Sequence, residues 1–175
     1  MGVWGNAPPG YGMRFIALAV AALLVWLDQW VKAWALAELP ARIPVIPGLF
    51  YFTYLENTGA AFGLFQGHAF ILAIISLVIL GVLFVLLLTG KIKERILIWG
   101  CALVFAGGVG NCIDRLTHGF VIDYLDFSAL FGFPVFNLAD CFVVIGVGLI
   151  MVYLIFIEGK QPTPGGGGPN EKDKS

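Results

Sequence analysis

The chain is 175 residues long, of which 59% are hydrophobic and 12% are charged. A water-soluble domain carries about 25% charged residues, so this chain has too few charges to cover a water-facing surface. Its net charge of −1 excludes the basic field that a nucleic-acid partner requires. The composition therefore indicates a single-domain integral membrane protein and excludes an ordinary cytosolic enzyme and a disordered chain.

The chain begins with a Gly- and Pro-rich segment, residues 1–14, which we expect to be a disordered cytoplasmic N-terminus. About 20 mostly apolar residues are needed to cross the hydrocarbon core. The first such stretch is 15–36. Its Asp28 and Lys32 are four residues apart and share one helix face. Two interpretations stay open here, a simple ion pair or functional groups within the bilayer.

The next connection, residues 37–68, contains RIPVIPGLFYFTYLENTG, which mixes β-branched and aromatic residues with Pro and Gly breaks. This pattern favours short strands. Its aromatic residues suit a membrane interface. We expect a small β-sheet cradle that rests on the outer leaflet. His68, at the end of this connection, is isolated and is expected to be solvated.

The second and third spans are predicted at 69–89 and 96–113, joined by a short loop that carries Lys91, Lys93 and Arg95. Short basic loops remain in the cytoplasm. With an even number of spans, both chain ends are then cytoplasmic and the two longer connections face outward. The loop charges therefore orient the whole bundle.

The motif GGVGNCIDR ends the third span and places Gly107, Asn111 and Arg115 on one helical stripe. The glycines also fit a plain helix-packing role. Asp114 is interpreted as half of a structural ion pair beside Arg115. In the following connection, VIDYLDF lies outside the spans, and Asp126 is expected to be a solvated loop charge. His118 is likewise expected to be solvated.

The fourth span, 136–157, begins with FNLAD, where Asn137 and Asp140 are three residues apart in the first turn. Asp140 also fits a purely structural role, as a group that stabilises the helix dipole. Residues 158–175 are predicted to be a disordered cytoplasmic tail. Residues 15–157 thus form one mainly α domain, a four-transmembrane-helix bundle with a β-sheet cradle on its outer side.

Three polar residues fall at one depth in the bilayer. At about 1.5 Å per residue, Asp28 lies roughly 20 Å, Asn111 roughly 24 Å and Asp140 roughly 26 Å from the inner ends of their helices. A transporter carries polar groups at mid-depth or along a complete path. A small ion-coupled transporter using Asp28 and Asp140 therefore remains only the alternative function, and a non-catalytic scaffold is a weaker one.

The residue inventory limits the chemistry. Cys101, Cys112 and Cys141 have no CxxC spacing and are expected to be buried thiols. The sequence shows no metal-ligand spacing, serine-hydrolase motif or nucleotide-binding motif, so we expect no metal and no cofactor. Carboxylates remain, and two of them sharing a proton can hydrolyse a peptide without a metal. Spacing does not show which two. The candidate residues are Asp28, Asp114, Asp123, Asp126 and Asp140.

Five motifs in this order resemble the lipoprotein signal peptidase (signal peptidase II) family: Asp28-Gln29, ENTGAAFG, GGVGNCIDR, VIDYLDF and FNLAD. The resemblance covers the region from Phe15 to about Ile157. It implies an aspartic endopeptidase of the bacterial inner membrane. Such an enzyme cuts the signal peptide from a diacylglyceryl-modified prolipoprotein just before the lipidated cysteine, with its active site near the outer, periplasmic leaflet.

The resemblance also implies roles for individual residues. The family's catalytic aspartates fall on Asp123, which arrives on a loop that we expect to close over the substrate, and on Asp140. As partners we expect prolipoprotein substrates and membrane lipids, with the chain acting as a monomer. The implied supporting or substrate-binding residues are Asp28, Asn57, Gly59, Asn111, Asp114, Arg115 and Asn137.

Overall fold

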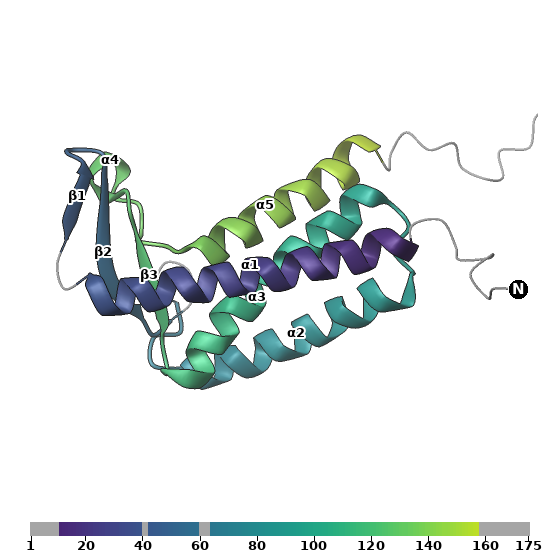
Figure 1. The fold of residues 1–175 in the computed structure, drawn as a ribbon, viewed down its shortest axis with the longest axis horizontal. Helices are drawn as coiled ribbons and strands as arrows, with labels where there is room; N and C mark the ends of the chain where they lie inside the picture. Colours follow the sequence, from purple (N-terminus) through teal and green to yellow (C-terminus); the bar gives the residue numbers. More distant parts are fainter. Residues whose placement is uncertain (1–10, 40–41, 60–63, 158–175) are drawn as a thin grey trace, which may run out of the picture.

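The structure is a computed structural model and describes residues 11–39, 42–59 and 64–157 (Figure 1). Within these residues, four helices are long and apolar enough to cross a membrane. A three-stranded sheet accompanies them. The predicted class, a mainly α membrane protein with a small sheet, is confirmed. The helices are α1 (Tyr11–Glu38), α2 (Ala69–Thr89), α3 (Arg95–Thr117) and α5 (Leu138–Val152), which continues as the π-helical turn η2 (Tyr153–Ile157).

Two helix boundaries differ from the prediction by four residues, and the others agree within two. Residues 11–14, expected to be disordered, form the first turn of α1. They are ordered because the buried Arg14 side chain donates hydrogen bonds to the carbonyl oxygens of Gly90 (3.1 Å) and Ile92 (3.3 Å) in the α2–α3 turn. Helix α3 continues past residue 113 to Thr117, because Asp114 finds a partner inside the bundle. The disorder predicted for 1–10 and 158–175 falls outside the described residues.

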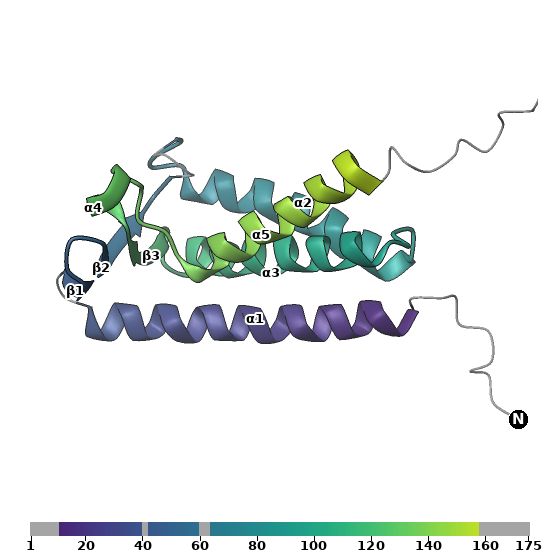
Figure 2. The same ribbon diagram turned by 90° about the horizontal axis from the view of Figure 1, so that it is seen from above.

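Helix α3 is the centre of the bundle and packs against α1, α2 and α5 (Figure 2). Glycines on α3 permit this close packing. A Cβ on Gly107 would collide with the carbonyl oxygen of Ala139 in α5, and a Cβ on Gly110 would collide with Asp28 of α1. Small residues let helix backbones approach closely inside a membrane. The glycine-packing interpretation of this motif is thus correct, and it holds together with the polar roles of its neighbours.

Large apolar side chains cover the outside of the bundle. Trp26, Val78 and Val144 are 64%, 64% and 70% exposed. A soluble monomer rarely exposes apolar surface on this scale, whereas a bilayer accommodates it. The chain is therefore a multi-pass membrane protein, whose helices turn their apolar outer faces toward lipid.

The sheet lies at the end of the bundle opposite the α2–α3 turn (Figure 1). Strands β1 (Ile43–Ile46) and β2 (Phe50–Asn57) come from the connection in which strands were predicted. The third strand, β3 (Val121–Asp126), was not predicted. It pairs antiparallel with β2, so that Leu55 lies opposite Asp123. A bridge between Leu125 and Phe136 then ties β3 to the chain that enters α5.

Strand β3 also corrects the expectation for Asp126, which is only 3% exposed. Its carboxylate pairs with Arg42 Nε at 2.8 Å and accepts a hydrogen bond from Thr53 Oγ1 at 3.0 Å. The Arg42 guanidinium also lies 3.7 Å above the Tyr51 ring. Asp126 is buried because β3 pairs with β2 and so brings Asp126 beside Thr53. The short helix α4 (Ser128–Phe131) follows β3.

Candidate active site

A cavity of about 650 Å³ lies where the sheet meets the ends of α3 and α5. Two acidic residues, Asp123 and Asp140, are among those that line it. The polar lining continues with Asn57, Asn111 and Arg115, while residues 133–136 and 143–145 form an apolar wall. Five of the residues predicted from the sequence thus line one hollow, although they come from β2, α3, β3 and α5.

The start of α5 sets the position of Asp140. Asn137 is the N-cap residue, and its side-chain Oδ1 accepts a hydrogen bond from the backbone N–H of Asp140 at 2.9 Å. In return, Asp140 Oδ2 accepts a hydrogen bond from the backbone N–H of Asn137 at 3.1 Å. This reciprocal capping box satisfies two otherwise unpaired N–H groups of the first turn. Asp140 therefore has the predicted helix-terminus role, and its carboxylate is also held at the cavity wall.

Strand β3 sets the position of Asp123, which is fully buried. Its Oδ1 accepts a hydrogen bond from Asn137 Nδ2 at 2.7 Å, and its Oδ2 accepts one from Asn57 Nδ2 at 2.9 Å. The expectation that Asp123 arrives on a loop is wrong, because β3 pairs with β2, which places Asp123 inside the sheet and brings Asn57 beside it. Closure of this segment over a substrate stays a prediction.

Two amides connect the carboxyl groups. Asn111 Nδ2 donates to Asp140 Oδ1 at 2.7 Å, while Asn111 Oδ1 accepts from Asn137 Nδ2 at 3.1 Å. Burial, followed by the negative charge of Asp140, raises the pKa of Asp123 from 3.8 to about 7. At neutral pH this site can therefore hold a proton between two acidic groups.

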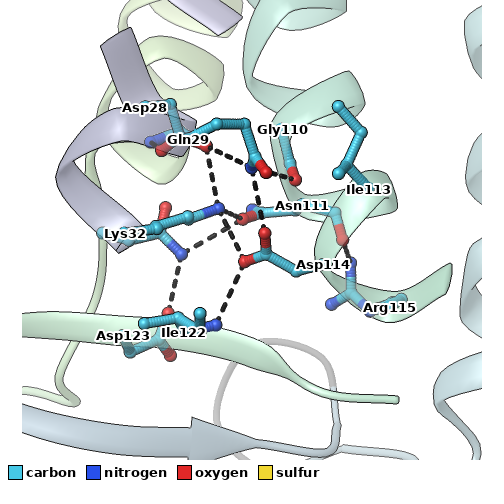
Figure 3. Close-up of polar contacts among 12 residues, drawn as sticks. Asp28, Gln29, Lys32, Gly110, Asn111, Ile113, Asp114, Arg115, Ile122 and Asp123 are labelled. Carbon is cyan, nitrogen blue, oxygen red and sulfur yellow. Dashed lines mark hydrogen bonds and ion pairs between the residues drawn. The ribbon is translucent and has the colours of Figure 1, made fainter. Parts of the chain in front are cut away.

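A buried ionic cluster supports the site from the side of α1 (Figure 3). Lys32 Nζ lies 2.9 Å from Asp28 Oδ2 and 2.9 Å from Asp114 Oδ2. The predicted Asp28–Lys32 pair is thus present. Asp114 is in a structural ion pair as expected, but its partner is Lys32 rather than the adjacent Arg115. Helix packing brings Lys32 to Asp114, and sequence proximity does not show that contact.

The same cluster reaches the other elements of the site. Asp28 Oδ1 accepts a hydrogen bond from the backbone N–H of Ala139 at 3.0 Å, in the first turn of α5. Asp114 Oδ2 accepts one from the backbone N–H of Ile122 at 3.1 Å, next to Asp123 on β3. Gln29 Nε2 donates to Asp114 Oδ1 at 2.9 Å. Both predicted supporting aspartates therefore hold backbone that carries a cavity carboxylate.

Arg115 holds the segment that follows β2. Its Nη2 donates to the carbonyl oxygen of Gly59 at 3.0 Å, and its Nη1 donates to that of Asn111 at 3.4 Å. The backbone N–H of Gly59 in turn donates to Asn57 Oδ1 at 3.0 Å. Arg115 therefore fixes the backbone around Asn57, which fixes the amide that contacts Asp123.

All nine predicted site residues lie in this one network, and the sequence reasoning missed two further members, Lys32 and Gln29. Lys32 was noted only as a partner of Asp28, because its contacts on α3 arise from packing. The cysteine expectation needs one correction. Cys101 and Cys112 are buried, but Cys141 is half-buried and lines the cavity. Its place directly after Asp140 in α5 was the available signal.

The types of side chain at this site limit the chemistry that it allows. Within the described residues, no group of three His, Cys, Asp or Glu side chains is placed to hold a metal ion. Two carboxyl groups of unequal environment face one cavity instead. One protonated and one ionised carboxyl group can together activate a water molecule and protonate a carbonyl oxygen.

The chain matches known proteins over most of its length. The family model for signal peptidase (SPase) II matches residues 20–156. A lipoprotein signal peptidase of Clostridioides difficile is 40% identical over 148 residues, 82% of this chain and 97% of that protein. One of Trichormus variabilis is 41% identical over 134 residues, 75% of this chain and 84% of that protein.

Solved structures share the fold as well. A bacterial membrane enzyme determined by the in meso method at 2.3 Å resolution has a TM-score of 0.73 and 32% sequence identity to this chain. The match covers 86% of this chain and 92% of that one. A second such structure, at 1.9 Å resolution, has a TM-score of 0.71.

Proposed function

The chain belongs to the signal peptidase II family, and from this premise we propose that Asp123 and Asp140 form the catalytic dyad of an intramembrane aspartic endopeptidase. As a member of that family, it is a bacterial membrane hydrolase that removes signal peptides from lipoproteins. The proposal rests on one observation above all. Asp123 and Asp140 line the same cavity and are joined through the amides of Asn137 and Asn111.

The two carboxyl groups have different tasks in this mechanism. Asp123, whose pKa is raised to about 7, carries the proton at neutral pH. Asp140 is then the ionised member, since two carboxyl groups that share a site hold one proton between them. It takes a proton from water as the water oxygen attacks the scissile carbonyl carbon. Asp123 gives its proton to the carbonyl oxygen, which becomes a hydroxyl of the tetrahedral intermediate.

The second half of the reaction restores the dyad. The intermediate loses its C–N bond as Asp140 passes its proton to the leaving nitrogen. Asp123 takes back the hydroxyl proton as the carbonyl re-forms, now as part of a carboxylic acid. One water is consumed and one peptide bond is broken, with no net change in the enzyme. The low polarity of the cavity wall strengthens the interaction between the two carboxyl groups.

The substrate is a prolipoprotein already modified with diacylglycerol, cut just before the lipidated cysteine. The apolar wall, residues 133–136 and 143–145, supports this choice because acyl chains and a signal helix favour such a surface. Each buried CH₂ contributes about 0.8 kcal/mol to binding. The enzyme is proposed to work as a monomer in contact with membrane lipids.

The bundle is oriented with its sheet end toward the periplasm and both termini in the cytoplasm. Lys91, Lys93 and Arg95 lie in or next to the α2–α3 turn, at the end away from the sheet (Figure 1). Basic short loops remain cytoplasmic. The cavity then opens near the outer leaflet of the inner membrane, where the acyl chains of a translocated lipoprotein lie.

The deciding experiment incubates the purified protein in detergent with a diacylated prolipoprotein and follows the shortened product. We expect cleavage by the unchanged protein, and a loss of about 1,000-fold or more in Asp123→Asn and Asp140→Asn, each still accumulating in the membrane. A non-lipidated precursor is the substrate control and should be cut poorly. Near-normal turnover in either variant would refute the dyad.

A further inference from the structure

The amide of Asn111 lies between a cation and a cavity carboxylate. Its Oδ1 accepts a hydrogen bond from Lys32 Nζ at 2.9 Å (Figure 3). Its Nδ2 donates one to Asp140 Oδ1 at 2.7 Å. An amide group is nearly symmetric in shape, so packing alone holds either orientation equally well. The direction of the amide therefore has to be set by the groups around it.

Two donors face the Asn111 oxygen, Asn137 Nδ2 and Lys32 Nζ, and the charged one is Lys32. Its ammonium group has three donors and no acceptor, and it is buried with 1% of the residue exposed. Three oxygens lie 2.9 Å from Nζ, on Asp28, Asp114 and Asn111. The two carboxylates hold the ammonium in place, and its third N–H then requires an oxygen from Asn111. The nitrogen of that amide must consequently face Asp140.

We propose that Lys32 is a positioning residue of the reaction, which keeps the Asn111 amide turned so that its N–H group holds the Asp140 carboxylate. This inference rests on the dyad proposed above. Lys32 comes from α1 and acts through α3 on α5. It does not line the cavity.

Reversal of the amide would disturb both carboxyl groups. Asn111 Oδ1 would face Asp140 Oδ1, which places two acceptors against each other. The 3.1 Å contact from Asn137 Nδ2 to Asn111 Oδ1 would also be lost, and Asn137 is the donor to Asp123. Losing the direction of one amide therefore moves both halves of the dyad, and small displacements of reacting groups cost up to about 100-fold in rate.

The test measures kcat, KM and thermal stability of Lys32→Met, which removes the donors and keeps the side-chain length. We expect kcat per folded protein to fall roughly 10- to 100-fold with KM within about twofold, because substrate contacts are unchanged. The matched control is Arg14→Met. Arg14 is another buried cation of α1, but it holds the α2–α3 turn at the far end of the bundle, so this variant should lower stability and keep kcat within about twofold.

Lys32→Met leaves two carboxylates without their cation and can fold poorly for that reason. The double variant Lys32→Met/Asp114→Asn keeps the net charge of the three groups at −1 and should recover stability. We expect kcat to stay low in it. Recovery of kcat along with stability would overturn the proposal, because the role of Lys32 would then be structural.

A double-mutant cycle with Asn111→Leu tests whether Lys32 acts on kcat through the Asn111 amide. In that background Lys32→Met should lower kcat by no more than about twofold further, since the amide it orients is gone. An undiminished effect there would overturn the proposal. Failure of this inference is distinguishable from failure of the dyad. Normal kcat in Lys32→Met, with Asp123→Asn and Asp140→Asn inactive, removes only the positioning role.

Discussion

Asn137 and Asp123, one at the N-cap of α5 and the other on β3, are joined by a 2.7 Å hydrogen bond from Nδ2 to Oδ1. The oxygen of the same amide caps the helix that carries Asp140. One side chain thus sets the spacing between a strand and a helix that hold the two proposed catalytic groups.

The pH dependence of cleavage should show a descending limb. The pKa of Asp123 is raised to about 7 by burial and by the charge of Asp140, so the dyad loses its proton as pH rises through that value. We expect kcat/KM, measured between pH 5 and 9, to fall about tenfold per pH unit once the pH exceeds the pKa of about 7.

Asp126→Asn is the control for that limb. Burial acts to raise the pKa of Asp126. This is outweighed by hydrogen bonds from Ser128 and Thr53 and by the charge of the Arg42 guanidinium, so the pKa lies below its ordinary value. This carboxyl group is ionised throughout the measured range. A limb that moved in Asp126→Asn would contradict its assignment to the dyad.

Asp123→Asn should gain stability relative to the unchanged protein as pH rises. A carboxyl group with a pKa of about 7 when folded and 3.8 when unfolded holds more protons in the folded state, so it destabilises the fold increasingly between those values. The full difference is about 4 kcal/mol, at 1.36 kcal/mol per pKa unit. We expect the Tm of the variant minus that of the parent to be more positive at pH 8 than at pH 5.

The amide of Asp123→Asn also places a donor against one of its two donor partners, Asn57 or Asn137, which lowers Tm at every pH. That constant cost is why the comparison uses the change with pH rather than the Tm itself. A Tm difference that stayed constant from pH 5 to 8 would argue against a buried titrating group at this position.

Gly107→Ala should destabilise the bundle. The added Cβ would collide with the carbonyl oxygen of Ala139, so α5 has to move away from α3. Overpacking of this kind costs about 1–3 kcal/mol. Gly148→Ala is a matched control in α5, where an added Cβ meets nothing within 4 Å and should be neutral or stabilise by about 0.5–1 kcal/mol. Equal loss of Tm in both variants would contradict this account of the packing.

A small maleimide should inactivate the enzyme through Cys141. This thiol is half-buried in the cavity wall beside Asp140, whereas Cys101 and Cys112 are 8% and 3% exposed. We expect mass spectrometry to find one modified cysteine per chain at the point where activity is lost. The variant Cys141→Ala should be active and resistant. Inactivation of that variant at the same rate would show that the reagent acts elsewhere.

Chelators should leave the reaction unchanged. The proposed chemistry uses two carboxyl groups and water, and the described part of the chain offers no cluster of three metal-ligating side chains. The measurement is the cleavage rate before and after incubation with EDTA and removal of the chelator. A rate that collapsed and returned on adding Zn²⁺ would require a different mechanism.

The helices and the candidate residues were predictable because their signals are local. Apolar stretches near 20 residues located the spans, and the order of five short motifs indicated the family. The capping relation between Asn137 and Asp140 follows from their spacing of three. Short strands were predicted in the first outer connection from its β-branched and aromatic residues.

What escaped prediction depends on contacts between distant segments. Strand β3 is short, and it is a strand only because β2 lies beside it, which also explains the burial of Asp126. Lys32 has an obvious partner four residues away in Asp28, and that local pair conceals its contacts on α3. Sequence spacing reveals neighbours within a helix, whereas contacts across a helix interface require the packed structure.

The capping box makes the first turn of α5 hold both acidic residues of the site at once. If that turn frays, Asp140 and the amide that holds Asp123 are released together, while most of the four-helix bundle stays intact. On heating, catalysis should therefore cease before circular dichroism records any loss of helix. The temperature gap between the two would measure how far the end of this one helix sets the working range of the whole enzyme.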